Sequence, residues 1–356
     1  MKSKIEPGSS KLTLREIAAE LGLSKATVSL AINNNPLVAQ KTRDRVRQKI
    51  DELGYVYNRR AASLTTGETR TVGLAVHDIS NPYFTAICTA IESVLSARGR
   101  MSFLCNTSES VHRQAQFISA LIEHNADGLI LCPVAGTSVE SLQPLIKRKL
   151  PTVLFTRDIP GAGLDFVGNN EIEALRLVTS HLIKLGHKRI AILGGNQLAL
   201  AAQQRREGFF LAMSEAGLAV PNELVIDCEN SPAAGAVAAR SLLKLDQPPS
   251  AIVGYSDQVA LGAMSGLLEA GVIPGRDIAV VGCDDIEEGA RSYIQLTTVR
   301  VQKGPIGLAA AEMLLRRLAD PTHPPESKLF EPELVVRRSC GATESGGELQ
   351  SPPFIL

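Results

Sequence analysis

Two segments of the chain have residue types that could perform catalysis, but each lacks a part that catalysis requires. Residues 254–258 (Gly-Tyr-Ser-Asp-Gln) resemble the turn that presents a nucleophilic serine, yet Gln258 stands where the second glycine is required. Residues 193–196 (Leu-Gly-Gly-Asn) follow an apolar run but lack the Gly-x-Gly-x-x-Gly spacing of a dinucleotide site. The six histidines show no metal-ligand spacing. We therefore expect a binding protein with no cofactor or metal, and not an enzyme.

Basic side chains that could bind a polyanion gather near the N-terminus. Residues 1–70 contain 13 Lys/Arg and 7 Asp/Glu, a net charge of +6. Because the whole chain has a net charge of zero, the remainder carries −6. A basic head on an acidic body favours contact with nucleic acid, with a solvated basic face as the alternative.

Three short amphipathic helices are expected to position these basic residues. Thr13 and Glu16 form a capping-box pattern at the start of the first helix, and Gly22 ends it. Ser24 can cap a second helix, and a third runs from about residue 40 to residue 53. Two short helices joined through residues 22–24 predict a helix–turn–helix, whose second helix enters the major groove. An ordinary three-helix fragment is the alternative interpretation.

From residue 72 onward, short apolar runs alternate with helical stretches. These runs comprise residues 71–76, 101–105, 128–131, 152–155, 189–193, 251–254 and 278–282. They are typical of strands that are buried on both faces of a parallel sheet. The alternation predicts an α/β fold, and its length favours two lobes with a cleft between them. Ligands of such sheets bind beyond the carboxyl ends of the strands, so His77, directly after the first run, is expected to reach a ligand.

Length and composition agree with a multidomain chain that contacts no membrane. The 356 residues exceed one ordinary core. No run approaches the roughly 18 apolar residues of a membrane span. The polar N-terminus has no apolar signal core, so we expect a cytoplasmic protein. The six cysteines form no Cys-x-x-Cys pair and are expected to be reduced thiols.

Several motifs follow one another along the chain: residues 12–18 (Leu-Thr-Leu-Arg-Glu-Ile-Ala), 22–29 (Gly-Leu-Ser-Lys-Ala-Thr-Val-Ser), 41–46, 53–58 and 61–64. Linked in this order, they resemble the LacI/GalR family of bacterial transcription repressors, and the resemblance continues to about Arg338. It implies a helix–turn–helix head (1–57), a hinge helix and linker (58–71), an effector-binding and dimerisation domain (72–340) and a flexible tail (341–356). The effector domain would resemble type I periplasmic sugar-binding proteins. Its first lobe would take in about 72–166 and 300–330, and its second about 167–299 and 331–340.

The helix–turn–helix pattern and the resemblance together imply how the head reads DNA. Leu64 of the hinge helix would wedge into the minor groove and kink the duplex. Leu30 stands where many members carry a guanine-binding arginine, so the operator half-site should differ from the usual one. Ala39 stands where a serine commonly caps the third helix. The full set of expected DNA contacts is Thr13, Ser24, Lys25, Ala26, Thr27, Ser29, Leu30, Asn33, Thr42, Tyr55, Asn58, Ala61 and Leu64.

The resemblance also implies an effector site in the cleft. Arg205 and Asp284 match family positions that bind effector hydroxyls or carboxylates, and Ser256 replaces the usual asparagine. Two arginines and a histidine suggest an acidic sugar, and the aromatic residues have helix packing as an alternative role. The full set of expected effector contacts is His77, Tyr83, Phe84, Arg157, Arg205, Asn230, Ser256 and Asp284.

Three partners follow from the resemblance: double-stranded operator DNA, a small sugar or sugar-acid effector, and a second copy of the chain. Two heads of a homodimer would read a palindromic operator, and the effector would change DNA affinity through the hinge. Such coupling is reciprocal, so DNA must also change effector affinity. A secreted sugar-binding protein is the alternative, and the basic head and the missing export signal disfavour it.

Overall fold

The computed structural model describes residues 12–55, 67–195 and 198–342, which divide into a head (up to Thr69) and a body (from Arg70). The expected contacts Asn58, Ala61 and Leu64 and the hinge helix lie outside the described residues. The head contains α1 (Leu14–Leu21), α2 (Lys25–Ile32) and α3 (Gln40–Leu53). Among the described residues, no helix combines the length and the apolar character needed to cross a membrane.

Local hydrogen bonds set the helix ends in the head. The Thr13 hydroxyl accepts from the Glu16 amide while the Glu16 carboxylate accepts from the Thr13 amide, so the capping box is present. Ser24 caps α2 by accepting from the Thr27 amide at 3.0 Å. Gly22 and Gly54 end α1 and α3 in the left-handed conformation, which costs glycine little. A small apolar core centred on Ile17, Val28 and Val46 holds the three helices together.

The start of α3 has no side-chain cap, because Ala39 occupies the N-cap position with an extended backbone (φ −54°, ψ 143°). A serine fits that backbone and would accept from an unpaired amide of the first turn. We expect Ala39→Ser to stabilise α3 by about 0.5–1 kcal/mol, measured as an approximately two- to five-fold slowing of amide exchange in that helix. Ser24→Ala is the matched control and should speed exchange in α2; unchanged exchange in both would show that capping does not limit either helix.

The first lobe of the body is a six-stranded sheet in the order β11-β5-β4-β3-β1-β2, with every pair parallel. Alternate strand residues point to opposite faces, so Leu74 and Ile130 meet α5 and α13 while Ala75 and Leu131 meet α6 and α7. The elements are β1 (Thr71–Val76), α5 (Pro82–Ala97), β2 (Met101–Asn106), α6 (Val111–Glu123), β3 (Gly128–Leu131), α7 (Gln143–Arg148), β4 (Thr152–Phe155), β5 (Asp165–Asn169), α13 (Lys303–Ala319) and β11 (Ser327–Phe330).

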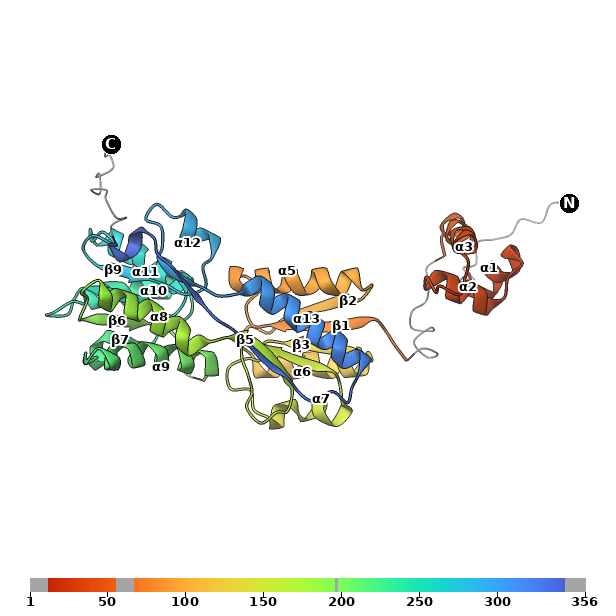
Figure 1. Cartoon of the computed structure of the whole chain (residues 1–356), viewed down its shortest axis with the longest axis horizontal. Coiled ribbons are helices and arrows are strands. Elements are labelled where there is room, and N and C mark those ends of the chain that lie inside the picture. Colours follow the sequence, from red (N-terminus) through yellow and green to blue (C-terminus); the bar gives the residue numbers. More distant parts are fainter. Residues whose placement is uncertain (1–11, 56–66, 196–197, 343–356) are drawn as a thin grey trace. The chain divides into compact units, whose positions relative to one another are not determined.

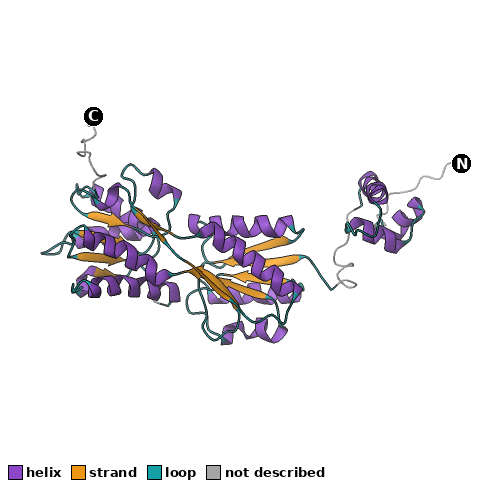
Figure 2. Cartoon of the chain, in the orientation of Figure 1, coloured by secondary structure: helices purple, strands orange, loops and turns teal. Residues whose placement is uncertain are grey.

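The second lobe is a four-stranded parallel sheet in the order β7-β6-β8-β9, also covered by helices on both faces (Figures 1 and 2). Ile252 packs toward α10 and α11, and Val253 packs toward α8 and α9. The elements are α8 (Glu171–Lys184), β6 (Ile190–Leu193), α9 (Leu200–Glu215), β7 (Val225–Ile226), α10 (Pro232–Leu242), β8 (Ala251–Gly254), α11 (Asp257–Glu269), β9 (Ala279–Val281) and α12 (Glu287–Arg291).

Crossing segments join the two lobes. An antiparallel pair, β10 (Thr298–Arg300) with β12 (Glu333–Val335), accompanies the chain on its way to and from α13 and β11 (Figure 1). Short 3-10 turns (Glu140–Leu142, Asn222–Leu224 and Arg338–Cys340) complete the body. Because β5 belongs to the first sheet and ends at Asn169, the lobe boundary expected near residue 166 falls inside a strand.

One expectation about the strands is wrong. The 101–105 run forms β2 but is not buried on both faces, since Met101, Phe103 and Leu104 are 66%, 52% and 51% exposed. The reason is its place at the edge of the sheet, where it pairs with β1 alone. Sequence periodicity also missed β5, which carries Asp165 and Asn169 among its five residues.

Candidate functional site

A cavity of about 690 Å³ opens where the carboxyl ends of both sheets meet. His77 and Asp78 follow β1, Arg157 follows β4, Tyr255 follows β8 and Asp284 comes shortly after β9. The N-termini of α5 and α8 contribute Tyr83, Phe84 and Glu171, and α9 contributes Arg205. The structure therefore gathers His77, Tyr83, Phe84, Arg157, Arg205, Asn230 and Asp284 from the predicted set around one space.

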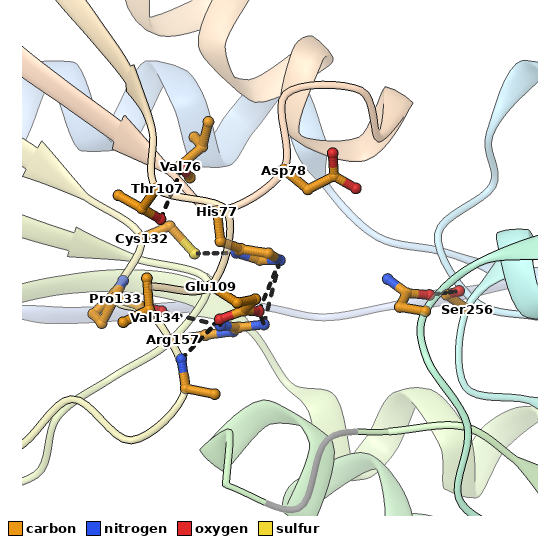
Figure 3. Close-up of polar contacts among 12 residues, drawn as sticks. Val76, His77, Asp78, Thr107, Glu109, Cys132, Pro133, Val134, Arg157 and Ser256 are labelled. Atoms are coloured by element: carbon orange, nitrogen blue, oxygen red, sulfur yellow. Dashed lines mark hydrogen bonds and ion pairs between the residues drawn. The ribbon is translucent and has the colours of Figure 1, made fainter. Parts of the chain in front are cut away.

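Arg157 is held by partners within its own lobe. Its guanidinium donates to both carboxylate oxygens of Glu109 (2.8 and 3.1 Å) and to the Pro133 carbonyl (3.1 Å), as Figure 3 shows. Its Nη2 also lies 3.3 Å from Nε2 of His77. The same Nε2 lies 3.5 Å from Oε1 of Glu109, and Nδ1 lies 3.6 Å from the Cys132 sulfur. Burial, and then the charge of Arg157, lower the pKa of His77 to about 4.

This shift predicts how stability depends on pH. Because the folded-state pKa of His77 lies below the unfolded value of 6.5, its stabilising effect is complete above pH 6.5 and is lost as the pH falls through 4. A shift of this size corresponds to about 3 kcal/mol. We expect the free energy of unfolding of the wild type to fall toward that of His77→Gln between pH 7 and pH 4.5, measured by urea titration. Parallel pH profiles for the two proteins would contradict the buried, neutral state of this imidazole.

Arg205 is the centre of the second lobe's wall. Its Nε donates to Glu171 at 2.5 Å, its Nη1 to the Tyr255 carbonyl at 2.8 Å and its Nη2 to Asp284 at 3.1 Å. All three ionic side chains are buried. Burial raises the pKa of Asp284, and the Arg205 charge opposes that rise. Both arginines of the cavity are thus already paired with carboxylates, which weakens the expectation of an acidic ligand.

Close packing of two helices brings Arg205 to Glu171. α9 carries Arg205 and, one turn later on the same face, Gly208. A Cβ at Gly208 would lie 2.0 Å from the carbonyl oxygen of Ile172, which adjoins Glu171 on α8. Only the absence of a side chain at residue 208 allows the helices to come this close.

The loop after β9 links the cavity to the crossing segments. Asp284 faces Arg205, whereas the next residue, Asp285, accepts from Arg300 (2.8 Å) and Arg337 (2.5 Å) on two of those segments. Asp284 has a φ of +127°, a conformation that an L-residue adopts only when its surroundings enforce it. Two neighbouring carboxylates of one loop therefore have different surroundings: Asp284 lines the cavity, and Asp285 contacts the segments that connect the lobes.

Two polar residues, Ser256 and Tyr83, differ from their expected place or role. Ser256 does not belong to the cavity wall; its buried hydroxyl caps α11 and donates to Asn230 at 2.5 Å, so that the wall residue is Asn230. The Tyr83 hydroxyl lies 3.0 Å from that of Thr156 and accepts from Asn169, so it is already paired. Serine at the N-cap is a common role, and nothing in the sequence distinguishes it from ligand binding.

The sequence did not point to Glu109 or Glu171, the acidic partners of the two arginines. Glu171 is the first residue of a helix and follows an asparagine cap, a usual place for an acidic residue. Glu109 lies in the loop after β2, 48 positions from its partner. Only the positive-φ turn at Ser108 and Glu109 is unusual there, and it cannot be read from residue types.

In the head, the expected base-reading side chains share one outer surface. Lys25, Ala26 and Leu30 of α2 are exposed and Ser29 is half-buried, so these residues are available to a groove. The Ser24 and Thr27 hydroxyls bond to each other at 2.9 Å, and the Asn33 amide donates to the Ser29 carbonyl. Thr13 is exposed, and Thr42 and Tyr55 are half-buried.

Comparisons with known proteins bear on both parts. Residues 13–58 match the family described as bacterial regulatory proteins, lacI family. Residues 69–330 match the periplasmic binding proteins and sugar binding domain of the LacI family. The chain is 33% identical, over 92% of its length and 98% of the relative, to the HTH-type transcriptional repressor PurR of Actinobacillus pleuropneumoniae serotype 3 (strain JL03).

Solved structures resemble the chain along nearly its whole length. One is the lac repressor dimer bound to operator and the anti-inducer ONPF, with a TM-score of 0.83, 25% identity and coverage of 94% of this chain and 100% of that one. Another is the transcriptional regulator CelR in complex with cellobiose, with a TM-score of 0.70, 29% identity and coverage of 92% and 99%.

Proposed function

Because the chain belongs to the LacI family of bacterial regulatory proteins and is a DNA-binding repressor rather than an enzyme, we propose that a small sugar-like effector in the cavity controls its binding to a palindromic operator. The observation that carries this proposal is the polar cavity at the carboxyl ends of both sheets, in a chain that also carries a helix–turn–helix head. The repressor would act in the cytoplasm, with no membrane partner.

Several features of the cavity support a sugar-like effector. Its volume suits a small ligand, and its wall combines aromatic residues with carboxylates that can accept from hydroxyls. The CelR relative was solved with cellobiose. A sugar acid is the less favoured form, since its carboxylate would have to compete with Glu109 or with Glu171 and Asp284 for an arginine.

Exposed apolar side chains on the body support a homodimer. Met101, Phe103 and Leu104 project from the edge strand β2, and Tyr293 is 77% exposed in the second lobe. Large exposed apolar side chains on an edge strand, such as those of β2, can mark a protein–protein contact. A two-fold dimer matches a palindrome, because each head reads one half-site.

We propose that the effector alters the angle between the lobes and thereby the spacing of the two hinge segments, residues 58–64. The loop that carries Asp284 and Asp285 is suited to transmit this change, since it contacts both the cavity and the crossing segments. Leu64 would insert into the minor groove when the hinges order on DNA. An effector changes DNA affinity only if it binds the two states with different affinity.

Selection of bound sequences from random DNA, followed by gel-shift titration, tests this function. We expect a palindromic site, binding by a dimer in sedimentation, salt-sensitive affinity and a change in affinity with at least one carbohydrate of a panel. Selection of no sequence over random DNA, with and without the panel, would overturn the proposal.

Leu30→Arg should change the base preference within the half-site. Leu30 is exposed on α2, where leucine can contact a thymine methyl but cannot bond guanine. An arginine there can donate two hydrogen bonds to guanine, worth about 1–3 kcal/mol of discrimination. Repeating the selection with the variant measures the change, and Leu37→Arg, at an exposed leucine outside α2, is the control. The same preferred half-site for Leu30→Arg and wild type would remove Leu30 from the base-reading set.

A further inference from the structure

One carboxylate oxygen in the cavity wall has no hydrogen-bond partner. Glu171 is 3% exposed and lines the cavity; its Oε2 accepts from Arg205, whereas its Oε1 is buried without a donor. Leaving a buried acceptor unpaired is costly, and more so for a charged group. A ligand that places a donor at this oxygen removes that cost.

The charges around this oxygen are unbalanced. Arg205 is the cation between two buried carboxylates, Glu171 and Asp284, so the three side chains together carry one net negative charge. Lys303 compensates the Asp284 side of this cluster, because its ammonium donates to the backbone carbonyls of Asp284 and Asp285 and its charge opposes the rise that burial causes in the pKa of Asp284. Buried ions are stable only when they are compensated, and Glu171 shares its one ion-pair partner, Arg205, with Asp284.

The rest of the wall has the same sign. Six of its residues are Asp or Glu and two are Arg; both arginines are paired with carboxylates of the wall, and Asp227 is paired with Arg206 from outside the wall. The histidine of the wall is neutral at pH 7, because burial lowers the pKa of His77 to about 4. The cavity therefore repels an anion and attracts a cation.

We propose that the effector carries a protonated amine on a polyhydroxylated framework, as an amino sugar does, and that Glu171 binds this ammonium group through Oε1. The inference rests on the proposed function, in which this cavity holds the effector. An ammonium supplies a donor to the unpaired oxygen and a second positive charge beside Glu171, which shares Arg205 with Asp284. A hydroxyl supplies only the donor, and a carboxylate supplies neither. Charge-assisted hydrogen bonds are about twice as strong as neutral ones, so the amine should decide specificity.

Calorimetric titration of the full-length protein at pH 7 with matched ligand sets tests the inference. Each set contains a 2-amino-2-deoxyhexose, its N-acetyl derivative, the parent hexose and the corresponding hexonate, in the gluco, galacto and manno series. In at least one series we expect the amine to bind at least about tenfold more tightly than the other three. The N-acetyl derivative keeps the nitrogen but loses the charge, and it separates the ammonium from the shape of the ligand.

Glu171→Gln should remove the preference for the amine while keeping an amide oxygen for Arg205. Glu173→Gln is the matched control on the same helix, because Glu173 pairs with Arg176 outside the cavity. If Glu171→Gln does not fold, the comparison of ligands with the wild type still decides. Equal or tighter binding of the hexose or hexonate in every series that binds overturns the amine inference but leaves the proposed effector function standing. No binding by any member of the panel counts against both.

Discussion

Arg205→Ala is expected to lower the free energy of unfolding of the body by about 3–5 kcal/mol and to abolish effector binding. The substitution removes the guanidinium that Glu171 and Asp284 share and leaves both buried carboxylates without their ion-pair partner. Urea unfolding followed by circular dichroism measures the loss of stability, and calorimetric titration measures the loss of binding. The deficit should shrink as the pH is lowered toward 5, because protonation neutralises the uncompensated carboxylates.

Arg206→Ala is the matched control, since the neighbouring arginine pairs with Asp227, whose side chain is 57% exposed. A partly solvated pair contributes about 0–1 kcal/mol. Two results would contradict this account: similar stability losses for the two variants, or an Arg205→Ala protein that still responds to effector. Similar stability losses would mean that Arg205 does not neutralise the buried carboxylates. A retained response to effector would mean that the effector binds elsewhere.

Gly208→Ala is expected to destabilise the body by about 1–3 kcal/mol and to weaken effector binding at least several-fold. The new methyl group would lie 2.0 Å from the Ile172 carbonyl, so α8 and α9 must separate. That movement lengthens the 2.5 Å contact of Arg205 with Glu171, which the two helices carry. Thermal unfolding and ligand titration of one protein sample measure both effects.

Gly304→Ala provides the comparison, because a Cβ at this position in α13 meets no atom within 4 Å. By helix propensity it should be neutral or stabilise by up to about 1 kcal/mol. If Gly208→Ala were equally harmless, the close approach of α8 and α9 would not be what positions the arginine.

Residue types and spacing were sufficient wherever a structure depends on near neighbours. The capping box at Thr13 and Glu16, the Ser24 cap and the glycine at residue 22 involve groups within a few positions of one another, so the sequence shows them directly. Apolar runs predicted most strands of both sheets for a similar reason, since burial on both faces requires continuous apolar residues. Strands at an edge or in a crossing segment escape that requirement, and β7, β10, β11 and β12 were missed. β5 is buried between β11 and β4 and was missed for another reason, since Asp165 and Asn169 shorten its apolar run.

By itself, the sequence determined the fold class, the family and several side chains of the cavity, among them Arg205 and Asp284. Tertiary structure alone decided what those side chains face. Glu171 meets Arg205 across 34 positions, and Glu109 meets Arg157 across 48. Such partners depend on strand order and on helix packing distance, which local patterns do not encode. The surplus negative charge of the cavity is a property of these pairings, and it changes the expected ligand from an acid to an amine.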